Sequence, residues 1–195
     1  QKEYFAVTGT NPSCFSDDLN RPVEQVTWDE ATTYCAQLTT QERAARRLPE
    51  GYEYRLPTEA QWEYACRAGT TTATAFGDGL SSYEANFDGT APYNGGVIGP
   101  CLPSTTPVGS YAPNAWGIYD MHGNVWEWCR DYYESFLPGG SVADPQGPNS
   151  GSWHVYRGGS WGDTGRHLRS ASRYGYWPDF RISHVGFRVV LVAVP

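Results

Sequence analysis

The chain has 195 residues and a formal net charge of −7, which fits one acidic domain. Thirteen of its fourteen cationic side chains are arginine and no basic run is longer than Arg46-Arg47, so an electrostatic nucleic-acid footprint is not expected. The longest C-terminal apolar run, Val189–Val194, is far too short for a membrane span and predicts a buried strand.

The composition predicts a loop-rich but packed fold. The chain contains 22 Gly, 14 Pro and 15% aromatic residues. Glycine and proline favour irregular segments. The 8 Trp and 14 Tyr need neighbours to pack against, which argues against disorder.

The N-terminal third carries the first helical signal. Turn signals at Asn11-Pro12 and at 20–22 predict a loop region, and residues 23–27 alternate like a short strand that enters a helix. Thr27 or Asp29 is suited to cap that helix, whose apolar stripe consists of Ala31, Tyr34, Cys35 and Leu38. The polar residues 39–54 indicate an insertion with turns.

A second helix is predicted by Thr58 and Gln61, which form the capping-box pattern of Ser/Thr and Glu/Gln three residues apart. It should end near Gly69, with these side chains mostly inward: Ala60, Trp62, Tyr64, Ala65 and Cys66. Residues 70–116 are rich in turn formers, and so long a loop region indicates a functional surface or ion-stabilised loops. Strands are predicted at 124–130, 153–157 and 185–193.

The five cysteines are odd in number and show neither a CxxC motif nor zinc-ligand spacing. Cys35 and Cys66 fall in the two predicted helices, where buried free thiols are common. The cysteines therefore predict free thiols and leave the cellular compartment open.

Five ordered motifs carry a family resemblance: Arg55–Tyr64 (RLPTEAQWEY), Gly117–Trp128 (GIYDMHGNVWEW), Arg157–Trp161 (RGGSW), Arg169–Arg173 (RSASR) and Val185–Arg188 (VGFR). With them the chain resembles the formylglycine-generating enzyme, or sulfatase-modifying factor, family. The resemblance implies an α+β, C-type-lectin-like single domain over residues 1–195. That domain would be loop-rich, with two helices and short antiparallel strands, and would lack the family's N-terminal strands. Where the family has disulfide partners for Cys35 and Cys66, this chain has Ser170 and Val189.

The enzymes of this family oxidise a substrate cysteine with copper(I), which two active-site thiolates hold because metal and ligand are both soft. Those cysteines follow the Gly-Gly-Ser-aromatic motif. Here residues 162–167 read Gly-Asp-Thr-Gly-Arg-His, and no cysteine follows Cys129. We therefore expect no copper and no family chemistry. Two alternatives stay open: a divergent oxidoreductase that uses Asp163, His167 and His184, and a structural domain of a larger surface protein.

The resemblance also implies a structural calcium site. Carried over to this chain, its ligands are the Asp120 side chain, the carbonyls of Gly123 and Val125, and the Glu127 carboxylate. Mixed carboxylate and carbonyl oxygens are what calcium selects. In the alternative, Asp120 caps a turn and Glu127 pairs with an arginine of region 157–173. A second family ion site needs an acid near Pro100, and none is there.

Tryptophans at alternate positions in a strand-like run are more often core than ligand platform. We therefore expect Trp126, Trp128 and Trp161 in the core. His122 lies within the turn motif and is expected to be structural.

Region 162–184 alternates framework residues with a second set, here called the spacer residues: Gly162, Asp163, Thr164, His167, Tyr174, Gly175, Tyr176, Trp177, Phe180, Ile182, Ser183 and His184. Every spacer except Trp177 is reachable from an AAY asparagine codon by changing adenines alone. The pattern resembles the variable proteins of diversity-generating retroelements, and the composition resembles a paratope. Ordinary drift within the family is the alternative.

These observations favour a non-catalytic module that binds a protein or glycan ligand on one concave surface formed by the spacer residues other than Gly175. Four aromatic side chains should be largely exposed, namely Tyr174, Tyr176, Trp177 and Phe180, whereas Trp161 and Phe187 should be buried. We expect carboxylates beneath this surface to hold Arg169, Arg173 and Arg188. A secreted or cell-surface location is favoured, and the oligomeric state is not assigned.

Overall fold

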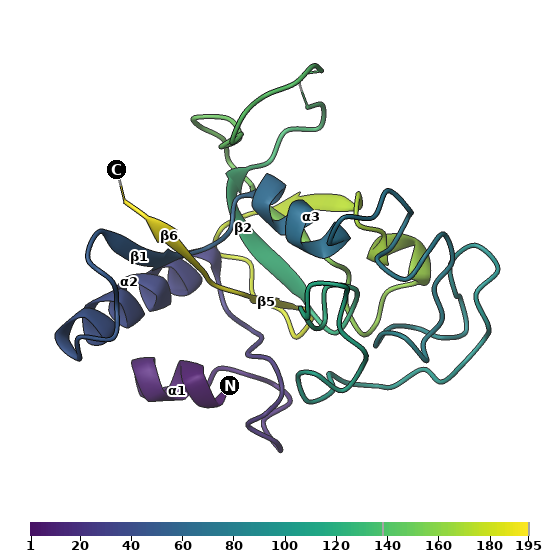
Figure 1. Cartoon of the computed structure of the whole chain (residues 1–195). Coiled ribbons are helices and arrows are strands. Elements are labelled where there is room, and N and C mark those ends of the chain that lie inside the picture. Colours follow the sequence, from purple (N-terminus) through teal and green to yellow (C-terminus); the bar gives the residue numbers. More distant parts are fainter. Residues whose placement is uncertain (138, 195) are drawn as a thin grey trace.

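The computed structural model describes residues 1–137 and 139–194. In these residues, three α-helices, one 3-10 helix and six short strands are joined by long loops (Figure 1): α1 (Lys2–Thr8), α2 (Trp28–Ala44), β1 (Tyr52–Arg55), α3 (Glu59–Arg67), β2 (Trp126–Tyr132), β3 (His154–Arg157), η1 (Gly165–Leu168), β4 (Arg173–Tyr176), β5 (Val185–Phe187) and β6 (Val190–Ala193). None of the described helices has both the length and the apolar character needed to span a bilayer.

Capping boxes start both predicted helices. The Thr27 hydroxyl accepts from the Glu30 N–H at the start of α2, and Thr58 does the same for Gln61 at the start of α3. Both helix starts are thus confirmed. The signal for them is local, because a capping box involves only residues three positions apart. Two expectations were wrong. Residues 23–27 form no strand, and α2 and β1 occupy much of the predicted insertion at 39–54. The short helix α1 lies beside α2 and was not predicted (Figure 1).

Two sheets organise the domain. The larger has the order β4-β3-β2-β5, and the smaller pairs β1 with β6. The strand predictions near 124–130 and 153–157 are confirmed, although β2 and β5 run parallel rather than antiparallel. The single strand predicted at 185–193 is instead divided into β5 and β6, which belong to different sheets. Strand β6 is not fully buried as expected, since its residues alternate between half-buried and exposed. Its partner β1 covers one edge of β6, and one face of this two-stranded sheet is open to solvent.

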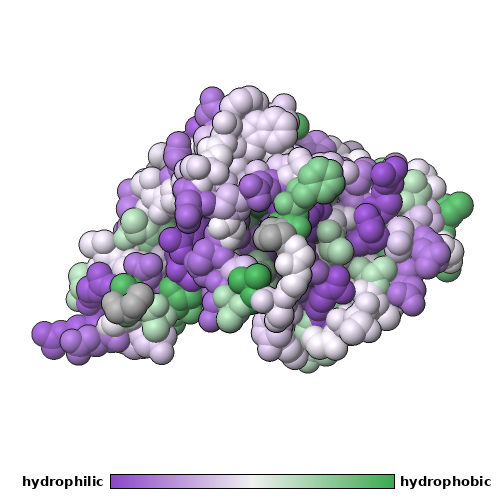
Figure 2. Space-filling view, turned by 90° about the horizontal axis from the view of Figure 1, so that it is seen from above, coloured by the Kyte–Doolittle hydropathy of each residue, from purple (hydrophilic) through white to green (hydrophobic). Residues whose placement is uncertain are grey.

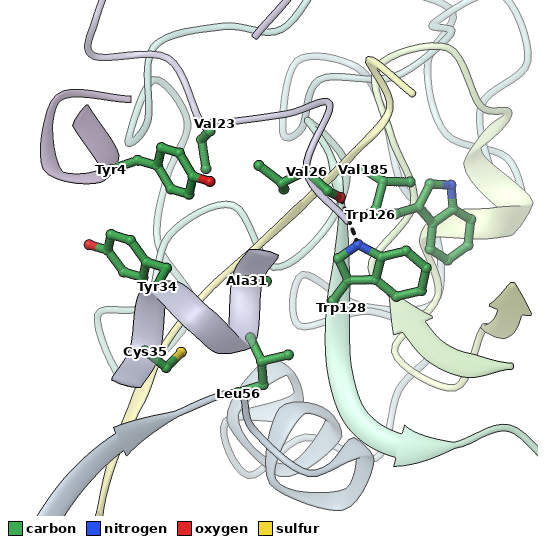
Figure 3. Close-up of a cluster of buried hydrophobic side chains, with 10 residues drawn as sticks. All are labelled: Tyr4, Val23, Val26, Ala31, Tyr34, Cys35, Leu56, Trp126, Trp128 and Val185. Carbon is green, nitrogen blue, oxygen red and sulfur yellow. Dashed lines mark hydrogen bonds between the residues drawn. The ribbon is translucent and has the colours of Figure 1, made fainter. Parts of the chain in front are cut away.

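The main core lies between α2 and the large sheet (Figure 3). Trp126 and Trp128 are buried there as expected, and the Trp128 Nε1–H donates to the Val26 carbonyl at 3.0 Å. Trp161 and Phe187 are only half-buried, so the expectation for them was wrong. Trp161 stacks on His184 at the rim of the core, with ring centroids 4.3 Å apart.

The second core cluster packs α3 against β2 and β3. Trp62 and Cys66 are buried in it as predicted, but Tyr64 is exposed and meets the Trp116 ring edge to face. Burial raises the pKa of the Cys66 and Cys35 thiols to about 12. Both cysteines are free and buried, which confirms the prediction of buried free thiols.

Two loop regions extend from the sheets. Residues 70–116 contain no helix or strand, as predicted, and residues 133–137 and 139–152 lie in loop segments that rise above α3 in Figure 1. The face that carries this second loop shows a few apolar side chains gathered near its centre within a mostly polar surface (Figure 2). Phe136, Leu137 and Val142 are the exposed apolar residues of the loop.

Candidate functional site

The edge of the large sheet carries a row of aromatic side chains. The register places Tyr156 opposite Tyr174 and His154 opposite Tyr176, so these four side chains share one face of the sheet. Tyr174 is 41% exposed, Tyr176 39% and the adjacent Trp177 49%. The exposure of these three residues was predicted. Phe180 is half-buried instead, because its ring packs on Tyr176 with centroids 3.9 Å apart.

Trp153 extends this row beyond the spacer residues. It is 40% exposed, and its ring centroid lies 6.4 Å from that of Tyr176 and 5.8 Å from that of Trp177. We call Trp153, Tyr174, Tyr176 and Trp177 the aromatic surface. Trp153 precedes region 162–184 and was not among the predicted binding residues. Only the pairing of β3 with β4 brings it to the same place.

Loop 160–168 supports the aromatic surface from one side. Asp163 Oδ2 accepts hydrogen bonds from the Trp126 Nε1–H at 2.8 Å and from the Ser160 hydroxyl at 2.5 Å. Asp163 Oδ1 lies 3.5 Å from His167 Nδ1, and the His167 ring meets Tyr174 edge-on at 5.7 Å. Asp163 therefore fixes the loop onto the core, whereas His167 faces the aromatic surface.

Several other spacer residues have structural contacts of their own. Thr164 pairs with Asp88 across a β-bridge, and Ile182 packs against the main core. His184 stacks on Trp161, and a Cβ at Gly162 would lie 2.7 Å from His184 Nε2. Burial lowers the pKa of His184. The Ser183 carbonyl accepts the Trp161 Nε1–H at 3.1 Å. Direct contacts thus join three pairs of spacer residues: Gly162 with His184, His167 with Tyr174, and Tyr176 with Phe180.

An ion-pair network lies on the opposite face of the sheet. Arg157 is fully buried and pairs with Glu59 and Glu63 of α3. Arg173 holds the same Glu59 through two bonds of 2.7 Å, and Arg188 pairs with Glu127. Carboxylates therefore hold Arg173 and Arg188, as expected.

Arg169 differs from that expectation. Its Nε donates to the Arg166 carbonyl at 2.9 Å, and its guanidinium lies 5.9 Å from the centroid of the Tyr93 ring. The side chain follows the turn after η1 toward the loop around Tyr93 and away from α3. No carboxylate among the described residues pairs with it.

The four residues carried over as calcium ligands line one pocket of about 430 Å³. Asp120 Oδ2 accepts from the Gly109 N–H at 2.7 Å, and burial raises the pKa of Asp120. Glu127 Oε2 accepts from the Trp62 Nε1–H at 2.6 Å, while Arg188 contacts both Glu127 oxygens. Glu127 thus pairs with Arg188 and not with an arginine of region 157–173. The donors suit calcium in chemical type, but Glu127 would have to give up part of its bonding to Arg188.

His122 is structural, as predicted. Its Nδ1 lies 2.6 Å from the Leu168 carbonyl, and its Nε2 accepts from the Ala75 N–H at 3.0 Å. Nδ1 is therefore the protonated nitrogen, and the ring joins three loops. Burial lowers the pKa of His122 to about 4.

The residues of the oxidoreductase alternative do not assemble into a metal centre. Within residues 1–137 and 139–194, no three His, Cys, Asp or Glu side chains are placed to hold a metal ion. Asp163 uses one carboxylate oxygen for Ser160 and Trp126, and His184 stacks on Trp161. Copper(I) does not fit the turn after Trp161 either, because hard Asp and His donors stand where soft thiolates would be needed.

Sequence comparison identifies the scaffold. The family model described as sulfatase-modifying factor enzyme 1-like domain matches residues 4–193. The chain is 36% identical over 178 residues to the formylglycine-generating enzyme of Streptomyces coelicolor, covering 87% of this chain and 52% of the enzyme. The Mus musculus formylglycine-generating enzyme is 34% identical over 185 residues, covering 90% and 45%. The chain thus spans about half the length of these curated relatives.

Solved structures give the same fold. Treponema denticola variable protein 1 matches with a TM-score of 0.80 and 28% identity, covering 98% of this chain and 80% of that protein. PvdO from Pseudomonas aeruginosa matches with a TM-score of 0.75 and 28% identity, covering 99% and 76%. These matches confirm the predicted α+β fold and the resemblance to variable proteins, with three α-helices in place of the two expected.

Proposed function

The chain belongs to the family of sulfatase-modifying factor enzyme 1-like domains, and from this premise we propose that it is a non-catalytic module that binds a protein or glycan ligand. The aromatic surface is the proposed contact site. Its three spacer residues are each about two-fifths to one-half exposed, and Trp153 adds a fourth exposed ring beside them. This exposed group of rings is the observation that carries the proposal. Large aromatic side chains offer contact area at a low cost in side-chain entropy.

The arrangement of the sheet supports this function. Ion pairs fix one face of β3 and β4 to α3, while the tyrosines project from the other face. Substitutions among the exposed rings therefore leave the buried framework intact. A rigid scaffold with a replaceable surface is also what a diversified variable protein requires, and we propose this role for the spacer residues with outward side chains.

Sequencing the same locus in sibling strains tests diversification directly. The expected result is that amino-acid differences concentrate at the spacer residues, while Arg157, Arg173 and Arg188 stay constant. An even spread of differences over residues 1–195 would contradict diversification. It would leave the simpler binding proposal standing.

A binding experiment tests the surface itself. The probes are a glycan array and a panel of bacterial surface proteins, each applied to the wild type and to the triple variant Tyr174→Ser, Tyr176→Ser, Trp177→Ser. Loss of each aromatic anchor is expected to cost about 2 kcal/mol, or roughly thirtyfold in affinity. The control variant is Tyr83→Ser, because Tyr83 is 66% exposed and lies outside the surface. Equal binding by the wild type and the triple variant would refute the assigned site.

Metal analysis separates binding from the oxidoreductase alternative. Stoichiometric copper or iron in the purified protein, together with turnover of a thiol substrate, would favour the enzyme. Calcium alone, or no metal, agrees with a binding module.

A further inference from the structure

A pocket of about 390 Å³ between α2, β1 and β2 has an unusual lining for this acidic chain. Three arginines contribute to it, Arg43, Arg55 and Arg130, with Glu53 as the acidic residue among them. Cys35 and Leu56, which Figure 3 shows in the main core, form part of its wall. The lining therefore carries a net positive charge, although the whole chain carries −7.

These arginines lack the partners that most others have. Ion pairs hold seven arginines of the described chain: Arg21, Arg47, Arg67, Arg157, Arg173, Arg181 and Arg188. Three of the remaining six line this one pocket. Arg43 donates to the Tyr52 carbonyl at 3.1 Å, and Arg130 donates to Gln146 Oε1 at 3.1 Å, so each has only a neutral partner.

Arg55 is the central residue. Its Nε lies below the surface and makes no hydrogen bond to any described residue. Burial first and the Arg130 guanidinium second lower the pKa of Arg55, and together they outweigh Glu53 and Asp131, which act in the opposite direction. Two arginines that line one pocket, one of them with an unsatisfied buried donor, are stabilised when an anion binds in that pocket.

We propose that Arg55 and Arg130, assisted by Arg43, form a binding site for a tetrahedral oxyanion, the phosphate or sulfate group of a small molecule. A guanidinium presents its donors in a fork that matches such oxygens. The volume holds the anionic group and about one attached sugar-sized unit. The site does not depend on the proposed function, since it shares no residue with the aromatic surface. Trp28 lines this pocket, and its ring stacks on His154, the strand partner of Tyr176. The stacked rings of Trp28 and His154 thus connect this pocket to the aromatic surface.

Thermal unfolding with defined anions tests the site. The probes are inorganic phosphate, inorganic sulfate and glucose 6-phosphate, each compared with sodium chloride at equal ionic strength, and glucose as the uncharged control. At ten times its dissociation constant, the bound anion should raise the melting temperature of a chain of this size by about 3–6 °C over chloride. The better of the two inorganic anions identifies the preferred group. A larger effect of glucose 6-phosphate than of phosphate places the attached sugar in the pocket.

Three variants make the test specific. Arg55→Gln and Arg130→Gln should each weaken anion binding at least about tenfold, because each removes charge-assisted hydrogen bonds. Arg46→Gln is the matched control, since Arg46 is exposed, forms no ion pair with a described residue and lies outside the pocket. Arg130 is also exposed, so its variant should fold even if the Arg55 variant does not. A wild-type shift no larger than that in chloride, or equal shifts in the wild type and Arg130→Gln, would overturn the proposal.

Discussion

Arg173 and Glu59 join β4 to the start of α3 through two parallel hydrogen bonds of 2.7 Å. Glu59 also lies 3.5 Å from the fully buried Arg157. A single carboxylate thus contacts two guanidinium groups beneath the strand that carries Tyr174 and Tyr176, and Glu63 supplies a second carboxylate for Arg157. The stability of the scaffold and the chemistry of the exposed surface therefore reside in different residues of the same strand.

Glu59→Gln is expected to lower the free energy of unfolding by about 3–5 kcal/mol, because it leaves Arg173 without its carboxylate and Arg157 with Glu63 alone. Urea unfolding measures the loss. The control is Glu42→Gln, which breaks the surface pair with Arg47 and should leave the midpoint unchanged. Similar midpoints for the two variants would show that the network adds little stability.

Substitutions on the aromatic surface should have little effect on folding. Tyr174→Ser, Tyr176→Ser and Trp177→Ser are each expected to change the free energy of unfolding by less than about 1 kcal/mol, because the rings are substantially exposed. Trp128→Ala is the comparison, since that ring is fully buried and its loss should cost about 3–5 kcal/mol. A surface variant as unstable as Trp128→Ala would place that ring in the framework.

Gly175 is the spacer residue with the least freedom to vary. A Cβ there would lie 2.3 Å from Cγ and 2.4 Å from Cβ of Tyr133, on the face of β4 opposite the exposed tyrosines. Gly175→Ala should therefore cost about 1–3 kcal/mol through overpacking. Adding Tyr133→Ala should recover part of that loss, and Gly139→Ala, where nothing lies within 4 Å, should be neutral. Thermal melts of the single and double variants measure these effects. Equal melting temperatures for Gly175→Ala and Gly139→Ala would contradict the predicted overpacking.

His122 predicts a loss of stability in mild acid. Its folded pKa is about 4, below the ordinary value of 6.5, so the unfolded chain binds the proton first as the pH falls. The contribution of His122 is complete above about pH 6.5 and decreases toward pH 4, by about 3 kcal/mol in total. Subtracting the unfolding free energy of His122→Asn from that of the wild type at each pH isolates this contribution. A difference that stays constant from pH 7 to pH 4 would contradict the assignment of a neutral, Nδ1-protonated ring.

The sequence was informative where structure depends on close neighbours. Thr27 and Thr58 act on residues three positions away, and the alternation of Trp126 and Trp128 identifies their shared face. It was less informative where the result depends on distant pairing. Trp153 joins the aromatic surface only because β3 lies beside β4, and the half-burial of Trp161 depends on where His184 stacks.

The roles of charged residues were the hardest to predict. Asp163 looks like an available ligand in sequence, yet Ser160 and Trp126 already bind one of its oxygens. Arg55 gave no signal at all, because its lack of a partner is visible only when every neighbouring side chain is placed. Local patterns indicate which residues are polar, but only the folded chain shows whether their hydrogen bonds are satisfied.

Calcium remains a prediction, and the geometry indicates a weak site. Asp120 and Glu127 line the same pocket, but Arg188 and Trp62 already contact both oxygens of Glu127. Binding must therefore rely mainly on Asp120 and on backbone carbonyls. We expect a dissociation constant of about 10⁻⁴–10⁻³ M, the range of low-affinity protein sites.

Millimolar calcium should then raise the melting temperature of the wild type by a few degrees, about 3–6 °C at ten times the dissociation constant, and a chelator should reverse the shift. Asp120→Asn should abolish the response, because it removes the carboxylate charge and keeps an oxygen that can accept from the Gly109 N–H. Magnesium serves as the control ion, since it demands a tighter octahedral site and should have a smaller effect. The same calcium shift in the wild type and in Asp120→Asn would exclude Asp120 as a ligand. No shift in the wild type would mean that Arg188 supplies the positive charge that Glu127 needs, without any metal ion.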